Sequence, residues 1–203
     1  MHLILVRHAL PERVDAVDHP DGSPAADPVL TDLGRRQAER LVDALRHEPV
    51  TGLYASPMAR ARGTAAPLAA ALDRPVEVRA DLREYDADDP RYVPVHEMPR
   101  LDPVAWERLL DGLLPEHVDE AAFRSRVVGA VDALVREHPG GTVVVVAHAG
   151  VVNAYLTHVL GIARPLPFAL DYVGISRVLA RRDGRRTVRS VNETRHVADL
   201  LDP

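Results

Sequence analysis

The sequence predicts an α/β fold with three layers, α/β/α, in which helices cover both faces of a mostly parallel sheet. Short apolar runs typical of buried strands alternate along the 203 residues with longer segments whose apolar residues recur at helical spacing. Near the C-terminus two strand-like runs flank Asp183-Gly184, a hairpin signal that predicts an antiparallel edge strand. Residues 84–118 break the alternation, so we expect a single domain over residues 1–203 with an inserted lid at about 84–118.

The first half of the chain predicts strands and helices in turn. Residues 2–6 form an apolar run typical of a buried strand, and the loop 15–28 is rich in Asp, Pro, Gly and Ala. Thr31 is a good N-cap for a helix whose apolar residues recur at helical spacing as far as Leu45. The remaining elements expected here are a strand at 53–55, a helix at about 58–72 and a strand at 76–78.

The regular pattern returns after the proline-rich segment. Apolar residues at helical spacing predict a helix over 119–138, which Pro139-Gly140-Gly141 ends. The run 142–147 is the clearest buried strand, and a helix is expected from its end to Gly161. The last two strands are expected at 175–180 and 187–191.

Two of the predicted strand ends carry residues that can do chemistry. Arg7 and His8 follow the first strand, and His148 follows the strand at 142–147. Ligands of such sheets bind beyond the carboxyl ends of the parallel strands. The pattern alone therefore predicts a site that contains these three side chains.

The residues around these strand ends suit phosphoryl transfer. A neutral imidazole, here His8, can attack phosphorus and form a labile phosphohistidine. Arginines must hold the phosphoryl oxygens, and Arg7 and Arg60 are the candidates. His148 is the candidate second donor and Glu84 the candidate acid that protonates the leaving oxygen.

Each of these residues also has a simpler interpretation. A histidine beside a buried strand can be satisfied by backbone groups, and an arginine on a helix is usually solvated, as we expect for Arg62. The acid is the least certain of the set, because Asp81, Asp86 or Asp88 could take the place of Glu84.

Composition excludes several other chemistries. The chain has no cysteine and no lysine, which excludes thiol nucleophiles, thiolate zinc sites, Schiff bases and the lysine of a P-loop. The other eight histidines show no zinc-binding spacing, so we expect no metal and no cofactor. The net charge of −5 argues against a bulk attraction to nucleic acid or to an anionic membrane. The N-terminus lacks the features of a signal peptide, so a cytoplasmic location is expected.

Five segments carry sequence motifs that occur in this order along the chain. They are L-V-R-H-A (5–9), L-T-D-L-G-R-R-Q-A (30–38), S-P-M-A-R-A-R-G-T-A (56–65), L-R-E (82–84) and V-V-V-V-A-H-A-G-V-V-N-A (143–154). Together they resemble one known family, the histidine phosphatase superfamily of phosphoglycerate-mutase-like proteins. The resemblance implies His8 as nucleophile, Arg7 and Arg60 as phosphate ligands, Glu84 as acid and His148 as second histidine. It also implies a phosphomonoesterase of the histidine acid phosphatase type.

Departures from the family pattern bear on the substrate. Val14 stands where members often have an asparagine, Asn153 where many have an arginine, and the acidic run 85–89 follows Glu84. An acidic run would repel the doubly phosphorylated intermediate of a mutase, so a hydrolase is favoured. A phosphoglycerate mutase and a regulatory protein that binds phosphate esters without turnover remain alternatives, with a metal-dependent hydrolase a weaker third.

The expected partner is a small phosphorylated metabolite, with neither nucleic acid nor a membrane involved. A homodimer through the exposed edge of the final hairpin stays open, although the arginines of that hairpin argue against it.

Overall fold

The computed structural model describes residues 1–15 and 25–201, so 16–24 of the predicted loop lie outside the described part. Within it, six strands form one sheet in the order β3-β2-β4-β1-β5-β6. The strands are β1 (His2–Arg7), β2 (Val50–Ala55), β3 (Glu77–Val78), β4 (Thr142–Ala147), β5 (Ile175–Ala180) and β6 (Arg186–Glu193). The helices are α1 (Asp32–Leu45), α2 (Ala59–Leu72), α3 (Met98–Leu101), α4 (Pro103–Leu110), α5 (Glu120–Glu137) and α6 (Ala149–Leu160), with short 3₁₀ helices η1 (Ala80–Leu82) and η2 (Ala198–Leu200).

The sheet confirms the predicted fold class. Strands β3, β2, β4 and β1 are parallel, β5 runs antiparallel to β1, and β6 pairs antiparallel with β5 at the edge. The turn between β5 and β6 contains Gly184 at φ +88°, a conformation that glycine adopts without steric cost. Strand β2 begins at Val50 rather than at 53, and its pairing with β4 shifts register between Val50 and Gly52.

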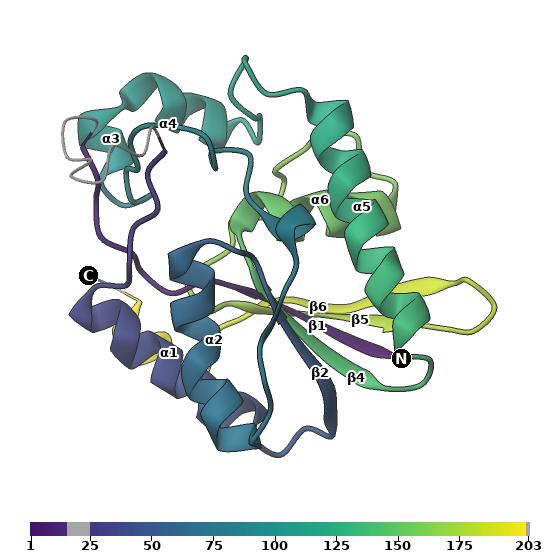
Figure 1. Cartoon of the computed structure of the whole chain (residues 1–203). Coiled ribbons are helices and arrows are strands. Elements are labelled where there is room, and N and C mark those ends of the chain that lie inside the picture. The colour runs from purple at the N-terminus through teal and green to yellow at the C-terminus, as the bar shows by residue number, and fades with distance from the viewer. Residues whose placement is uncertain (16–24, 202–203) are drawn as a thin grey trace.

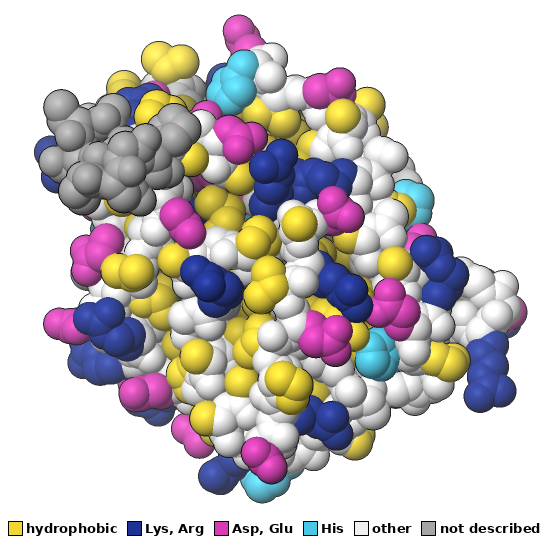
Figure 2. Space-filling model, in the orientation of Figure 1, with side chains coloured by type: hydrophobic (Ala, Val, Ile, Leu, Met, Phe, Trp, Pro, Cys, Tyr) yellow, Lys and Arg dark blue, Asp and Glu magenta, His cyan; other side chains and the backbone are white. Residues whose placement is uncertain are grey.

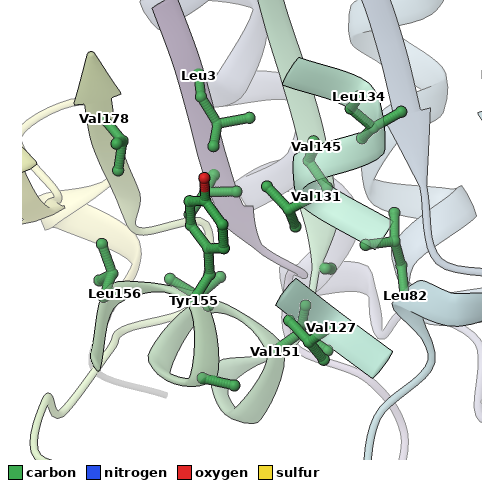
Figure 3. Packing of buried hydrophobic residues seen from close by; sticks show 14 of the residues in the cluster. Leu3, Leu82, Val127, Val131, Leu134, Val145, Val151, Tyr155, Leu156 and Val178 are labelled. Atoms are coloured by element: carbon green, nitrogen blue, oxygen red, sulfur yellow. The ribbon is translucent and has the colours of Figure 1, made fainter. Parts of the chain in front are cut away.

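Helices cover both faces of the sheet, as Figure 1 shows, with α1 and α2 on one side and α5 and α6 on the other. Residues Leu3 to Val6 of strand β1 are all apolar because their side chains alternate between the two layers. Leu3 and Leu5 pack in the cluster with α5 and α6 that Figure 3 shows, whereas Ile4 and Val6 pack with α1 and α2. The first strand is therefore fixed from both sides.

Side-chain caps fix the two helices that follow β1 and β2. Thr31 accepts a hydrogen bond from the backbone N–H of Gly34 at 2.8 Å, which confirms it as the N-cap of α1. Helix α2 has no cap of its own, and the carboxylate of Asp27 instead accepts the N–H of Ala59 at 2.7 Å. The bond from Ala59 ties the first turn of α2 to the segment that precedes α1.

The 84–118 segment lies beyond the carboxyl ends of the parallel strands and contains α3 and α4 (Figure 1). The sequence pattern did not reveal these two helices because both are short and carry a proline in the first turn. The carboxylate of Asp102 caps α4 by accepting the N–H of Ala105 at 3.1 Å. Backbone hydrogen bonds of 3.0 and 2.9 Å between Val14 and Tyr92 tie the segment to the chain that follows β1.

The visible surface mixes charges. Acidic and basic side chains are interspersed over the face in Figure 2, without a large field of one sign. None of the helices that the structure describes is both long enough and apolar enough to span a bilayer.

Candidate active site

The register of two neighbouring strands brings His8 and His148 together. Arg7 of β1 lies opposite Ala147 of β4, so the residue after each strand emerges at the same edge of the sheet. The N–H of His8 donates to the carbonyl of Ala147 at 2.9 Å. The two imidazole rings lie 5.2 Å apart, centroid to centroid, in an edge-on arrangement. The structure thus brings together the two histidines that the sequence pattern places at the carboxyl ends of strands.

His8 is buried and held with one nitrogen facing the pocket. Its Nδ1 lies 2.8 Å from the carbonyl oxygen of Ala9. Because a carbonyl only accepts, Nδ1 carries the proton and Nε2 keeps a free lone pair. Burial first, and then the guanidinium groups of Arg60 and Arg7, lower the pKa of His8 well below its ordinary value of 6.5. The imidazole is therefore neutral at pH 7, as a nucleophile requires.

Arg7 points into the same pocket and is fixed by a single loop. Its Nη1 donates to the carbonyl of Leu170, and its guanidinium lies over the ring of Tyr172, 3.9 Å from the centroid. Among the residues that the structure describes, Nε of Arg7 is buried without a hydrogen-bond partner. This donor remains for a ligand.

Arg60 lies in the first turn of α2 and is only 1 % exposed, whereas Arg62 is exposed as predicted. Its Nη2 pairs with Asp86 at 2.9 Å, and its guanidinium lies over the ring of Tyr92. Its Nε and Nη1 are buried and find no partner within the described ranges. A buried cation with unsatisfied donors is costly unless an anion completes it, so the arrangement fits a phosphoryl group.

Glu84 is buried at the N-terminus of α6. Its Oε2 accepts the N–H of Gly150 at 2.7 Å, and its Oε1 accepts the N–H of Tyr85 at 3.1 Å. Burial first, and the nearby Asp86 second, raise the pKa of Glu84 from 4.5 to about 7, against the opposing effect of these N–H groups. A carboxyl group with that pKa holds a proton near neutral pH and can donate it.

The other acids considered from the sequence are less suited to that task. Asp86 lines the pocket but forms an ion pair with Arg60. Asp81 and Asp88 are exposed and are not part of the pocket wall. The geometry therefore favours Glu84 over its alternatives.

His148 lies behind His8 and is fully buried, without forming part of the pocket wall. Its Nε2 is 2.7 Å from Oγ of Ser56, the residue that follows β2. Its Nδ1 has no partner among the described residues. Burial, Arg60 and His8 lower the pKa of His148 well below 6.5, so this ring is neutral too. When Ser56 donates to Nε2, the proton of His148 sits on Nδ1 and is available to an oxygen close to His8.

A pocket of about 510 Å³ is lined by Arg7, His8, Arg60 and Glu84. Its wall combines the ends of β1, α2 and α6 with the 84–118 segment and with residues 166–172, which we call the 166–172 loop. Sequence reasoning missed this loop, which matches no motif and is placed by contacts far apart in the chain. Asn153, known only as a departure from the family pattern, holds it by bonding both backbone groups of Phe168 at 3.1 Å.

A second asparagine holds the other end of the 166–172 loop. The side chain of Asn192 accepts the N–H of Asp171 at 2.9 Å and donates to its carboxylate at 2.8 Å. Sequence reasoning assigned Asn192 no role, and in the structure its φ of +56° places it in the left-handed region. Both asparagines act on the loop that carries Leu170 and Tyr172, the partners of Arg7.

No group of three or more His, Cys, Asp or Glu among the described residues is placed to hold a metal ion. The arginines of the described pocket wall are Arg7 and Arg60.

Comparison with known proteins agrees with this geometry. The family model of the histidine phosphatase superfamily (branch 1) matches residues 3–194. The chain belongs to that superfamily and is a phosphatase by class. Phosphoserine phosphatase 1 of Hydrogenobacter thermophilus is similar to it, with 28 % identity over 206 residues that cover 98 % of this chain and 95 % of that one.

Solved structures share the fold. YhfR of Bacillus stearothermophilus superimposes with a TM-score of 0.76 at 21 % identity, over 96 % of this chain and 98 % of that one. Phosphoserine phosphatase of Entamoeba histolytica, in complex with 3-phosphoglyceric acid, gives a TM-score of 0.73 at 21 % identity over the same shares.

Proposed function

We propose that the protein is a metal-independent phosphomonoester hydrolase that acts through a phosphohistidine on His8, in the manner of histidine acid phosphatases. Its substrate is a small phosphorylated metabolite. One observation carries the proposal: the free Nε2 of a neutral His8 shares a pocket with unpaired arginine donors and a proton-bearing Glu84.

In the first step, Nε2 of His8 forms a bond to phosphorus while the bond from phosphorus to the ester oxygen breaks. Arg7 and Arg60 neutralise the equatorial oxygens, and Nδ1–H of His148 adds a hydrogen bond to them. Glu84 gives its proton to the departing alkoxide, so the alcohol leaves neutral.

In the second step, water attacks the phosphohistidine. Glu84, now a carboxylate, takes a proton from the water as the oxygen bonds to phosphorus and the N–P bond breaks. Inorganic phosphate leaves, and both His8 and Glu84 return to their starting protonation states. The residues named in these two steps supply the proton transfers and the positive charge that the reaction requires.

The direct test is hydrolysis of 4-nitrophenyl phosphate in EDTA from pH 5 to 8. Wild type should turn over, His8→Ala should lose at least about 10³-fold in kcat, and His47→Ala, an exposed histidine away from the pocket, should behave as wild type. Protein-bound phosphate that is labile to acid and stable to alkali should accumulate in wild type but not in His8→Ala. Substantial turnover by His8→Ala would refute the nucleophile.

The alternatives predict other results. A mutase would interconvert phosphoglycerates only with a bisphosphorylated primer, and a binding protein would take up vanadate or phosphate with no turnover of any ester. Loss of activity in EDTA that added metal restores would point to a metal-dependent hydrolase.

A further inference from the structure

Much of the pocket wall is aromatic, including the two rings that lie against the arginines. The chain has one Trp, five Tyr and two Phe, and five of these eight side chains line this single pocket. They come from the 84–118 segment and from the 166–172 loop. The five are Tyr85, Tyr92, Trp106, Phe168 and Tyr172.

Apolar aliphatic side chains fill the spaces between the rings, among them Val95 and Leu109. The volume of about 510 Å³ falls in the range of roughly 300–1,000 Å³ that is usual for sites of drug-sized ligands. A phosphoryl group bound at the arginines would occupy only one end of it. The remainder must accommodate the alcohol part of the ester.

Positive charge is confined to the phosphoryl end. Besides Arg7, His8 and Arg60, the only basic side chain of the described pocket wall is His96, which lies beside Glu97. The wall also carries the carboxylate of Asp171, fixed by Asn192. A second anionic group on the substrate would meet no counter-charge there.

The arginines that could have supplied such a counter-charge are engaged elsewhere. Arg13 pairs with Glu97 at 2.9 Å, and Arg83 lies 3.4 Å from Asp88. Arg91 pairs with Asp102 at 2.5 Å. None of the three belongs to the pocket wall.

We propose that the substrate is a phosphomonoester of an uncharged alcohol with an aromatic or other flat apolar body, which lies between the rings of the 84–118 segment and those of the 166–172 loop. The proposal rests on the proposed function and narrows it. Esters whose alcohol part bears a carboxylate or a second phosphate are disfavoured, because burying an unpaired anion against aromatic walls costs more than their contacts return.

A matched pair of substrates tests this directly. In 4-(carbamoylmethyl)phenyl phosphate and 4-(carboxymethyl)phenyl phosphate, a methylene separates the varied group from the ring, so the two phenols leave almost equally well. We expect kcat/KM to be at least about tenfold higher for the amide than for the carboxylate. Equal values, or a preference for the carboxylate, would overturn the inference while the proposed function stood. Failure of wild type to hydrolyse either ester would refute the proposed function and this inference with it.

A variant of Trp106, on α4, tests whether this part of the pocket wall contacts the alcohol group of the substrate. Trp106→Leu should lower kcat/KM for the amide ester by about tenfold, mainly through KM, and leave that for methyl phosphate within about twofold. Val104, on the same helix and 74 % exposed, lies outside the pocket wall, so Val104→Ala should match wild type on both substrates. Equal losses on the amide ester and methyl phosphate in Trp106→Leu would show that Trp106 supports the fold or the chemistry rather than the alcohol group, and would count against the proposal.

Discussion

Gly150 and Glu84 fit against each other with no space between them. The N–H of Gly150 donates to Oε2 of Glu84 at 2.7 Å, and a Cβ placed on Gly150 would stand 2.3 Å from Oε1. Any side chain at this position must displace the carboxyl group. We therefore expect Gly150→Ala to lower kcat/KM for an alkyl phosphate by about 10²-fold or more, since the alkoxide then leaves without its acid.

The leaving group gives the control for Gly150→Ala. A 4-nitrophenolate leaves without protonation, so 4-nitrophenyl phosphate should lose far less activity than an alkyl ester. Gly129 on α5 has open space where a Cβ would stand, and Gly129→Ala should retain full activity on both. Equal losses on the two esters in Gly150→Ala would argue that Glu84 is not the acid.

The pKa of Glu84 sets the alkaline limit of activity. Burial and Asp86 raise it to about 7, so the acid loses its proton as pH passes that value. For alkyl phosphates, kcat should fall about tenfold per pH unit above the limit. Glu84→Gln, which has no proton to lose, should be much slower and should show no such fall between pH 6.5 and 8.5. An unchanged alkaline limb in Glu84→Gln would assign that ionisation to another group.

Because the pKa of Glu84 is raised on folding, ionisation of this residue destabilises the native state at alkaline pH. Between its unfolded value of 4.5 and its folded value of about 7, the native state holds a proton that the unfolded chain has released, so stability falls as pH rises. At pH 8 Glu84→Gln should be more stable than wild type by on the order of 2 kcal/mol, which raises Tm by roughly 4–8 °C. At pH 4.5 the gain should vanish. Thermal unfolding at the two pH values measures it, and an equal gain at both would refute the linkage.

Ser56 should act through His148. Its Oγ lies 2.7 Å from Nε2 of His148, and this hydrogen bond selects the tautomer with a proton on Nδ1. We expect Ser56→Ala to lower kcat by about tenfold while the fold is kept. In a double-mutant cycle the same change should have no further effect once His148→Ala is present. Additive losses would mean that Ser56 acts on its own.

Asn192 should support Arg7 from a distance, because it fixes Asp171 and with it the 166–172 loop. Both Asn192→Ala and Asn192→Gly remove the side-chain bonds, and each should lower kcat/KM by about tenfold. The φ of +56° strains alanine but not glycine, so the alanine variant should melt roughly 2–4 °C below the glycine variant. Wild-type kinetics in both variants would show that the loop holds Arg7 without this contact.

The sequence predicts the parts of the site that depend on strand ends. His8 and His148 follow two apolar runs, and neighbouring parallel strands necessarily end at one edge. Only the family resemblance separates Glu84 from the acids around it, because the physical features that distinguish it, burial and the N–H of Gly150, are not local in sequence. The partners of Arg7 lie 163 residues or more away in the chain, at Leu170 and beyond, where no periodicity points to them. The pairing of Ser56 with His148 likewise depends on strand order rather than on spacing.

Helices α3 and α4 contain no buried residue, although Met98, Trp106 and Leu109 face the pocket. His8, by contrast, follows strand β1, whose side chains pack into the hydrophobic clusters on both faces of the sheet. Exchanging side chains on the two helices therefore risks little of the folding free energy, whereas the reacting groups tolerate almost no change. Substitutions on α3 and α4 can therefore change substrate preference one at a time while the protein stays folded and active. This is because the residues that contact the alcohol group contribute little to folding, whereas the reacting groups are attached to the core.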